Sequence, residues 1–64
     1  KLVEVVGSSA TGTDDAIRRA IETAASTLRH IDWFEVTETR GHVVDGKVAH
    51  YQVELKVGFR IGNS

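Results

Sequence analysis

The strongest constraint in this sequence is the stretch from Trp33 to Phe59, where polar and apolar residues alternate on both sides of Asp45-Gly46. Alternation with a period of two is typical of a β-strand that buries one face. Asp-Gly is a strong signal for a two-residue type I′ turn, because both central residues of that turn need a positive φ angle. The stretch therefore predicts two long strands that pair as an antiparallel hairpin.

The strand after the turn separates into two faces. Its apolar face comprises Ala49, Tyr51, Val53, Leu55, Val57, Phe59 and Ile61. Its other face comprises Val48, His50, Gln52, Glu54, Lys56, Gly58 and Arg60. Before the turn, the same alternation puts Trp33 on the side opposite Phe34, and thus on the face of Gln52 and Val48. A tryptophan at this place is either an edge-of-core residue or a platform for an interface or a stacked ligand, and alternation leaves both interpretations open.

The first half of the chain predicts one strand and one helix. Residues 1–6 are rich in β-branched residues and predict a short strand that ends at Gly7-Ser8-Ser9. Thr13 is the expected N-cap of a helix over residues 14–29. The apolar stripe of this helix comprises Ala16, Ile17, Ala20, Ile21, Ala24 and Leu28. We expect the α+β class, with β-α-β-β order and a three-stranded antiparallel sheet wrapped on one helix, in a single domain over residues 1–64.

Composition limits the classes of function. The chain has 64 residues, so its core is small, and it has no cysteine for a disulfide or a thiolate metal site. Self-association is the natural supplement to such a core. The net charge of −1 argues against a nucleic-acid partner, and no run of about 18 apolar residues is present to span a membrane. We see no signal-peptide pattern and expect a cytoplasmic protein without a bound metal.

The chemistry-bearing residues favour binding over catalysis. His42 and His50 could serve a small hydrolase, but two exposed histidines in a hairpin are the simpler interpretation. Trp33 offers an aromatic face, and the primary amide of Gln52 can both donate and accept hydrogen bonds. Such a pair suits a flat ring with adjacent N–H and C=O groups, such as a flavin pyrimidine or a nucleobase. A structural or partner-binding module without a cofactor is the alternative. The Arg18-Arg19 pair could contact a phosphate, although a solvated helix face explains it more simply.

Blocks along the whole chain resemble the dodecin family. The resemblance is carried by residues 27–36 (Thr-Leu-Arg-His-Ile-Asp-Trp-Phe-Glu-Val), 40–42 (Arg-Gly-His), 51–53 (Tyr-Gln-Val), 56–60 (Lys-Val-Gly-Phe-Arg) and 5–9 (Val-Val-Gly-Ser-Ser). Dodecins are small β-α-β-β flavoproteins that assemble into hollow homododecamers. The resemblance implies flavin pairs held between tryptophans of two subunits, with Trp33 as the stacking residue and Gln52 on the edge of the isoalloxazine. The implied role is storage, buffering and photoprotection of flavin, without catalytic turnover.

The resemblance also implies roles for four charged or ionisable residues. Glu38 matches a position near the sugar chain of the flavin, and Arg40 and His42 can attract a phosphate, which favours flavin mononucleotide (FMN) over riboflavin. Arg40 and Arg60 match positions that contact coenzyme A in some dodecins. By strict alternation, however, Glu38, Arg40 and His42 face away from Trp33. Either the strand bulges or bends, or these residues reach a neighbouring subunit, and the sequence leaves both possibilities open.

Overall fold

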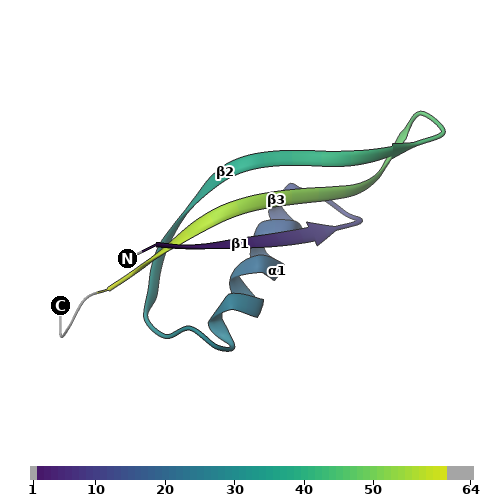
Figure 1. The fold of residues 1–64 in the computed structure, drawn as a ribbon. Helices are drawn as coiled ribbons and strands as arrows, with labels where there is room; N and C mark the ends of the chain where they lie inside the picture. The colour runs from purple at the N-terminus through teal and green to yellow at the C-terminus, as the bar shows by residue number, and fades with distance from the viewer. Residues whose placement is uncertain (1, 61–64) are drawn as a thin grey trace.

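The computed structural model describes residues 2–60, and its elements follow the predicted order. They are strand β1 (Leu2–Ser9), helix α1 (Thr13–Ala25), strand β2 (Ile31–Val44) and strand β3 (Lys47–Phe59). The strands form one sheet in the order β1-β3-β2, and both neighbouring pairs are antiparallel. Figure 1 shows the helix on one side of this sheet. The predicted topology is therefore confirmed; Lys1 and Ile61, placed in strands by the sequence, lie outside the described residues.

The turn between β2 and β3 has the predicted backbone. Asp45 has a φ angle of 54° and Gly46 one of 76°, so both central residues are left-handed, as a type I′ turn requires. The hairpin is far longer than the rest of the fold. The molecule measures 50 × 19 × 14 Å along its principal axes, and the turn extends well beyond the helix (Figure 1). Much of the hairpin is thus left uncovered by its own chain.

The core lies between the helix and the central strand. Its fully or almost fully buried side chains are Ala16, Ala20, Val53, Leu55 and Val57. The alanines let the helix lie close to the sheet, and the approach is closest at Gly7 of β1. A Cβ atom at Gly7 would lie 2.7 Å from the Cβ atom of Ala20, which is too close for any side chain. The predicted apolar stripe is therefore confirmed from Ala16 to Ala24, although Leu28 lies beyond the helix, and the apolar face of β3 is confirmed from Tyr51 to Phe59.

Both ends of the helix differ from the prediction. Thr13 is the first helical residue and Gly12 is the N-cap, without a side-chain capping hydrogen bond. The helix ends at Ala25, four residues before the predicted end. There the Ser26 hydroxyl donates to the Thr23 carbonyl oxygen at 2.7 Å, and such local side-chain bonds compete with a continuing helix. The predicted end was wrong because the apolar spacing continues to Leu28, whereas the α-helical backbone ends at Ala25.

The first strand is longer than predicted. β1 continues to Ser9 because β3 is long enough to pair with it, with Ser8 opposite Gln52 and Ser9 opposite Tyr51. The small polar residues that were expected to end the strand are thus part of it. This extension brings β1 to the same part of the sheet as the polar residues of the hairpin.

Candidate functional site

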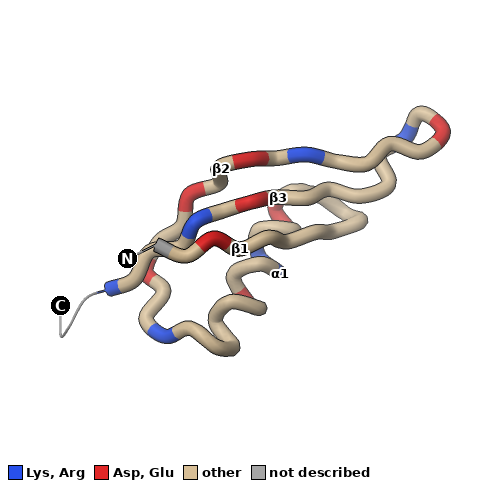
Figure 2. Tube along the Cα trace, in the orientation of Figure 1, with Lys and Arg blue, Asp and Glu red and all other residues tan. Residues whose placement is uncertain are grey.

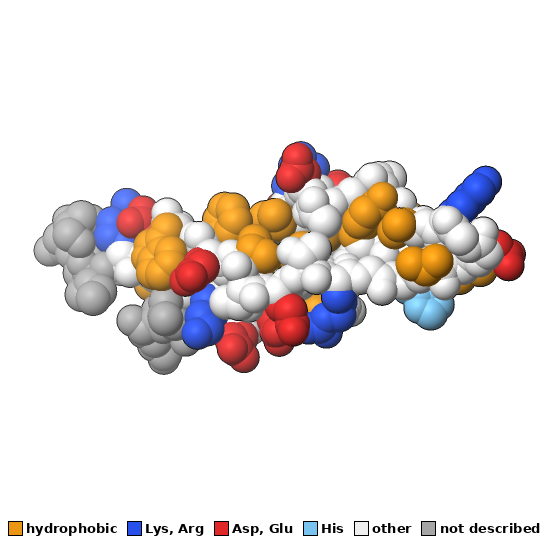
Figure 3. All heavy atoms as spheres, turned by 90° about the horizontal axis from the view of Figure 1, so that it is seen from above, with side chains coloured by type: hydrophobic (Ala, Val, Ile, Leu, Met, Phe, Trp, Pro, Cys, Tyr) orange, Lys and Arg blue, Asp and Glu red, His pale blue; other side chains and the backbone are white. Residues whose placement is uncertain are grey.

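Trp33 lies on the face of the sheet away from the core. It pairs with Gly58 of β3, and its indole occupies the space above that glycine. The side chain is 47% exposed, so about half of it is free to contact a ligand or another subunit. Figure 3, which views the molecule from above Figure 1, shows separate hydrophobic patches along this face, with charged side chains mostly toward its edges. This arrangement favours the platform interpretation over that of an edge-of-core tryptophan.

A β-bulge in β2 decides how the middle of the hairpin faces. Val36 pairs with Leu55 and Glu38 pairs with the next residue of β3, so Thr37 is an extra residue without a partner. The Thr37 hydroxyl donates to the Glu54 carbonyl oxygen at 3.0 Å. The bulge reverses the alternation that follows it. Strict alternation was therefore wrong for this segment, and the bulge is the correct one of the two possibilities left open by the sequence.

The bulge creates a ladder of polar pairs on the outer face. Each member of β2 lies opposite one of β3; the pairs are Glu38 with Glu54, Arg40 with Gln52, and His42 with His50. The charged positions of β2 and β3 lie side by side in the middle of the hairpin (Figure 2). Glu38, Arg40 and His42 consequently share a face with Gln52 in a single chain. No neighbouring subunit is needed to bring these four residues together.

Arg40 is the centre of this ladder. Its guanidinium donates to the Gln52 Oε1 atom at 3.1 Å, forms an ion pair with Glu38, and lies 3.5 Å from the Glu54 carboxylate. The hydrogen bond from Arg40 is the main cause that holds the pKa of Glu38 below its usual value. Because the Gln52 oxygen accepts from Arg40, the amide N–H groups of Gln52 remain to donate to a ligand. Arg40 is thus shared among three acceptors rather than free for an anion.

A polar hollow of about 420 Å³ lies beside Gln52. All three strands contribute to its lining, which comprises Ser8, Arg40, Gly41, His42, His50 and Gln52. Strands β2 and β3 approach closely here, since a Cβ atom at Gly41 would lie 2.9 Å from the His50 carbonyl oxygen. Hydroxyl, imidazole and amide groups around one hollow can donate hydrogen bonds to phosphate or carbonyl oxygens.

Trp33 and Gln52 are far apart within one chain. Trp33 lies opposite Gly58, and Gly58 is six positions after Gln52 along β3. At about 3.3 Å per residue, this separation is roughly 20 Å. One flat three-ring system is too short to touch both residues. A single chain therefore places the two residues on one face without forming a complete ring-binding site.

Arg60 and Val48 lie away from the ladder. Arg60 lines a separate hollow of about 570 Å³ at the end of the helix, together with Ile21, Ala25, Leu28, Arg29, His30 and Ile31. A second bulge, at Ala49, shifts the pairing near the turn so that Val48 lies opposite Val43. Val48 also lies beside Gly41, whose partner Tyr51 is on the core side. The expectation that Val48 shares the face of Trp33 was therefore wrong.

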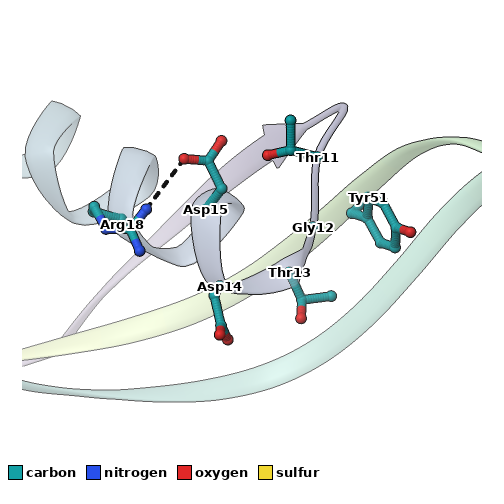
Figure 4. Close-up of a pocket in the computed structure, with 7 residues that line it drawn as sticks. All are labelled: Thr11, Gly12, Thr13, Asp14, Asp15, Arg18 and Tyr51. Atoms are coloured by element: carbon teal, nitrogen blue, oxygen red, sulfur yellow. Dashed lines mark hydrogen bonds and ion pairs between the residues drawn. The ribbon is translucent and has the colours of Figure 1, made fainter.

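In the hollow at the start of the helix, the Asp15 carboxylate is bound by groups of its own chain. Figure 4 shows Asp15 directed toward Arg18, with which it forms an ion pair at 3.2 Å. The buried hydroxyl of Ser9 donates to the other oxygen of Asp15 at 2.7 Å, and this hydrogen bond is the main cause that lowers the pKa of Asp15. Arg19 also contacts Asp15, at 2.8 Å. The two arginines thus bind a carboxylate of their own helix, as the simpler interpretation expects.

Two residues of the outer face were not singled out from the sequence. Gly58 supports the indole of Trp33, and its place on the outward face was visible in the alternation. Ser8 reaches the polar hollow only because β1 extends beyond its predicted end, and no local signal indicates that extension.

Over residues 2–60, no cluster of three or more residues suited to a metal ion is present. Within the same range, no helix is both long and apolar enough to cross a membrane.

Comparison with known proteins gives one consistent result. A family model described as Dodecin matches residues 1–62. The dodecin of Thermus thermophilus is 52% identical over 61 residues, which are 95% of this chain and 88% of that protein. The structure of the Streptomyces coelicolor dodecin is 55% identical with a TM-score of 0.89, covering 100% of this chain and 91% of that one. The Streptomyces davaonensis dodecin is 49% identical with a TM-score of 0.89, covering 98% and 93%.

Proposed function

The chain belongs to the dodecin family, whose members bind flavins, and we propose that it stores FMN between paired copies of itself. The half-exposed Trp33 on the outer face of a long hairpin is the observation that carries this proposal. An indole in this position can stack on an isoalloxazine, and stacking of a flat base on an aromatic side chain contributes roughly 1–3 kcal/mol.

The separation of Trp33 and Gln52 favours a ligand shared by two chains. Within one chain they lie roughly 20 Å apart along β3. An antiparallel second copy of the hairpin would bring the Gln52 of one chain near the Trp33 of the other. The N–H groups of Gln52, left to donate by Arg40, can then bind a carbonyl oxygen on the ring edge. The Trp33 of one copy would thus stack on the flavin ring, and the Gln52 of the other copy would donate a hydrogen bond to its edge.

Exposed apolar side chains support self-association. Those on the described surface include Val6, Phe34, Val43, Val44 and Val48, each about half exposed or more. A small core leaves a chain of this size with little stability of its own, and burial of such residues between copies would add to it. We propose the hollow homododecamer implied by the family resemblance as the arrangement that buries them.

The polar hollow beside Gln52 supports FMN rather than riboflavin. His42, His50 and Ser8 surround it with groups that can donate to phosphate oxygens. Arg40 would contribute less charge to a phosphate, since Glu38 and Glu54 already contact its guanidinium. Glu38 would act chiefly by holding Arg40 in place. A phosphate in this hollow would add affinity for FMN that riboflavin lacks.

Coenzyme A is a second candidate ligand at a different place. Arg60, Arg29 and His30 line one hollow beside apolar residues of the helix, which suits an anion with an apolar part. Arg40 lies in the other hollow, so one chain does not offer both arginines to the same ligand. Coenzyme A would have to bind between copies if both arginines contact it.

We propose storage, buffering and photoprotection in the cytoplasm, with no catalytic step. Stacking on an indole can quench light-excited flavin, and the outer face offers ion-paired carboxylates rather than an activated nucleophile. His42 and His50 are assigned to ligand binding rather than to hydrolysis. A cofactor-free structural module is the competing function, and it requires that neither FMN nor riboflavin changes the emission of Trp33.

A fluorescence titration tests the proposal. Bound flavin should lose its emission, and Trp33→Ala should weaken FMN affinity about 5- to 150-fold, which corresponds to the loss of roughly 1–3 kcal/mol of stacking. Light scattering should give the same mass for both proteins. Riboflavin, titrated in parallel, measures the contribution of the phosphate. Equal quenching by the parent protein and by Trp33→Ala would show that the stacking site is elsewhere.

A further inference from the structure

Gly58 is buried although it lies on the outer face of the sheet. It pairs with Trp33, and the indole of Trp33 covers it. An added Cβ atom at Gly58 would overlap the indole atoms Nε1, Cε2 and Cζ2, the last at 2.6 Å. The indole therefore occupies the volume in which every other amino acid carries its first side-chain atom. Trp33 and Gly58 fit together as a pair.

The backbone at Gly58 gives no other reason for a glycine. Its φ angle lies outside the left-handed region; among the described glycines, only Gly46 has a positive φ there. Any amino acid could adopt the strand conformation at this position, and glycine in the interior of a strand weakens it. The missing Cβ atom is thus the property that the position uses.

We propose that Gly58 is a positioning residue for the flavin-stacking face of Trp33. By admitting the pyrrole side of the indole against β3, Gly58 fixes which part of the ring is covered and which 47% of the side chain is exposed. A methyl group at this position would force Trp33 into another rotamer and move the stacking surface. The effect on flavin binding rests on the proposed function, whereas the placement of the indole by Gly58 does not.

The geometry can be tested without a ligand. Trp33 is the only tryptophan, so the near-ultraviolet circular dichroism of the indole reports its surroundings alone. Gly58→Ala should change this signal, whereas Gly12→Ala should not, because nothing lies within 4 Å of a Cβ atom at Gly12. An unchanged indole signal in Gly58→Ala would overturn the proposal, whatever the protein binds.

The consequence is tested by titration with FMN. Gly58→Ala should weaken FMN binding at least tenfold at unchanged mass by light scattering, and Gly12→Ala should bind as the parent does. If Gly58→Ala shifts the indole signal but binds FMN normally, Gly58 does not position the stacking face. If the parent itself binds no flavin, the proposed function fails while the indole signal still decides the geometry.

A double variant covers the case in which Gly58→Ala does not fold. The overlap involves only the indole, so Trp33→Ala combined with Gly58→Ala should fold as well as Trp33→Ala alone. Urea unfolding of the four proteins in this cycle measures the coupling between the two positions. If Gly58→Ala is equally destabilising with and without the indole, then the glycine has a different role and the proposal is wrong.

Discussion

Deletion of Thr37, alone and together with Thr39, tests the bulge that assembles the polar ladder. Thr37 and Thr39 are both exposed threonines of the same strand, two positions apart. Thr37 has no partner on β3, so its deletion should leave Glu38 opposite Glu54 and all later pairs unchanged. Deletion of Thr39 as well leaves no unpaired residue to take up the loss, so every following residue up to the turn should then turn to the other face.

The structure sets the expected costs. Deletion of Thr37 removes one hydrogen bond, from its hydroxyl to the Glu54 carbonyl oxygen, which is worth about 1 kcal/mol net. No buried side chain changes sides. The added deletion of Thr39 turns Arg40 away from Gln52 and breaks a hydrogen bond to a charged donor, worth roughly 1–2 kcal/mol more at this half-exposed position. The free energy of unfolding should therefore fall further for the second deletion.

Disulfide formation reports the facing directly. The chain has no cysteine, so His42→Cys and His50→Cys introduce the only two thiols. Residues directly opposite each other in an antiparallel pair have Cα atoms about 4.5–5.5 Å apart, which is within the range of a disulfide. Thiol titration after mild oxidation should find no free thiol in the parent background or after deletion of Thr37. It should find both thiols free after deletion of both threonines.

Two results would contradict the bulge. If deletion of Thr37 alone frees both thiols, then β2 follows strict alternation and Thr37 is an ordinary ladder residue. A cross-link that survives deletion of both threonines would show that the segment from Glu38 to His42 is held by something other than its register with β3. Urea unfolding of each variant excludes loss of the fold as the reason.

Two further predictions concern stability. Leu55→Ala removes a fully buried side chain at the centre of the core and should lower the free energy of unfolding by about 3–5 kcal/mol in urea. A loss below about 1 kcal/mol would place the core elsewhere. The pKa values of Asp15 and Glu38 are lowered by folding, so their stabilisation is full above about pH 4.5 and is lost as the pH falls through the lowered values. The urea midpoint should therefore fall below pH 4.5, and fall less in Asp15→Asn; an equal fall in both would contradict the role of Asp15.

The sequence predicted the features that depend on local pattern. Element order, the turn at Asp45-Gly46 and the buried face of β3 follow from spacing and from the φ preferences of two residues, and all are confirmed. The end of the helix was missed because apolar spacing continues to Leu28 while the backbone turns at Ser26. The long first strand was missed because its length is set by the partner strand rather than by its own residues.

The sequence did not predict which face of the sheet carries the polar ladder, because two bulges shift the pairing of its residues. Counted from the turn, strict pairing would place Arg40 opposite Tyr51 on the core side. The bulge at Ala49 shifts the pairing by one residue, and the bulge at Thr37 shifts it back, so that Trp33 again lies opposite the residue that the turn dictates. Between Trp33 and the turn, only the segment between these two bulges is displaced; a third irregularity lies before Trp33, where Ile31 pairs with Phe59.

These paired bulges explain how one strand serves two purposes. Without them, the residues that β2 needs for its core face near Val36 would set the facing of Arg40 as well. With them, the strand keeps Val36 on the core side and still turns Arg40 outward to Gln52. Because each bulge alone would also move Trp33 or the turn out of register, the two must occur together. The candidate site is therefore a property of the hairpin's register, which the two bulges and the length of β2 between them set together.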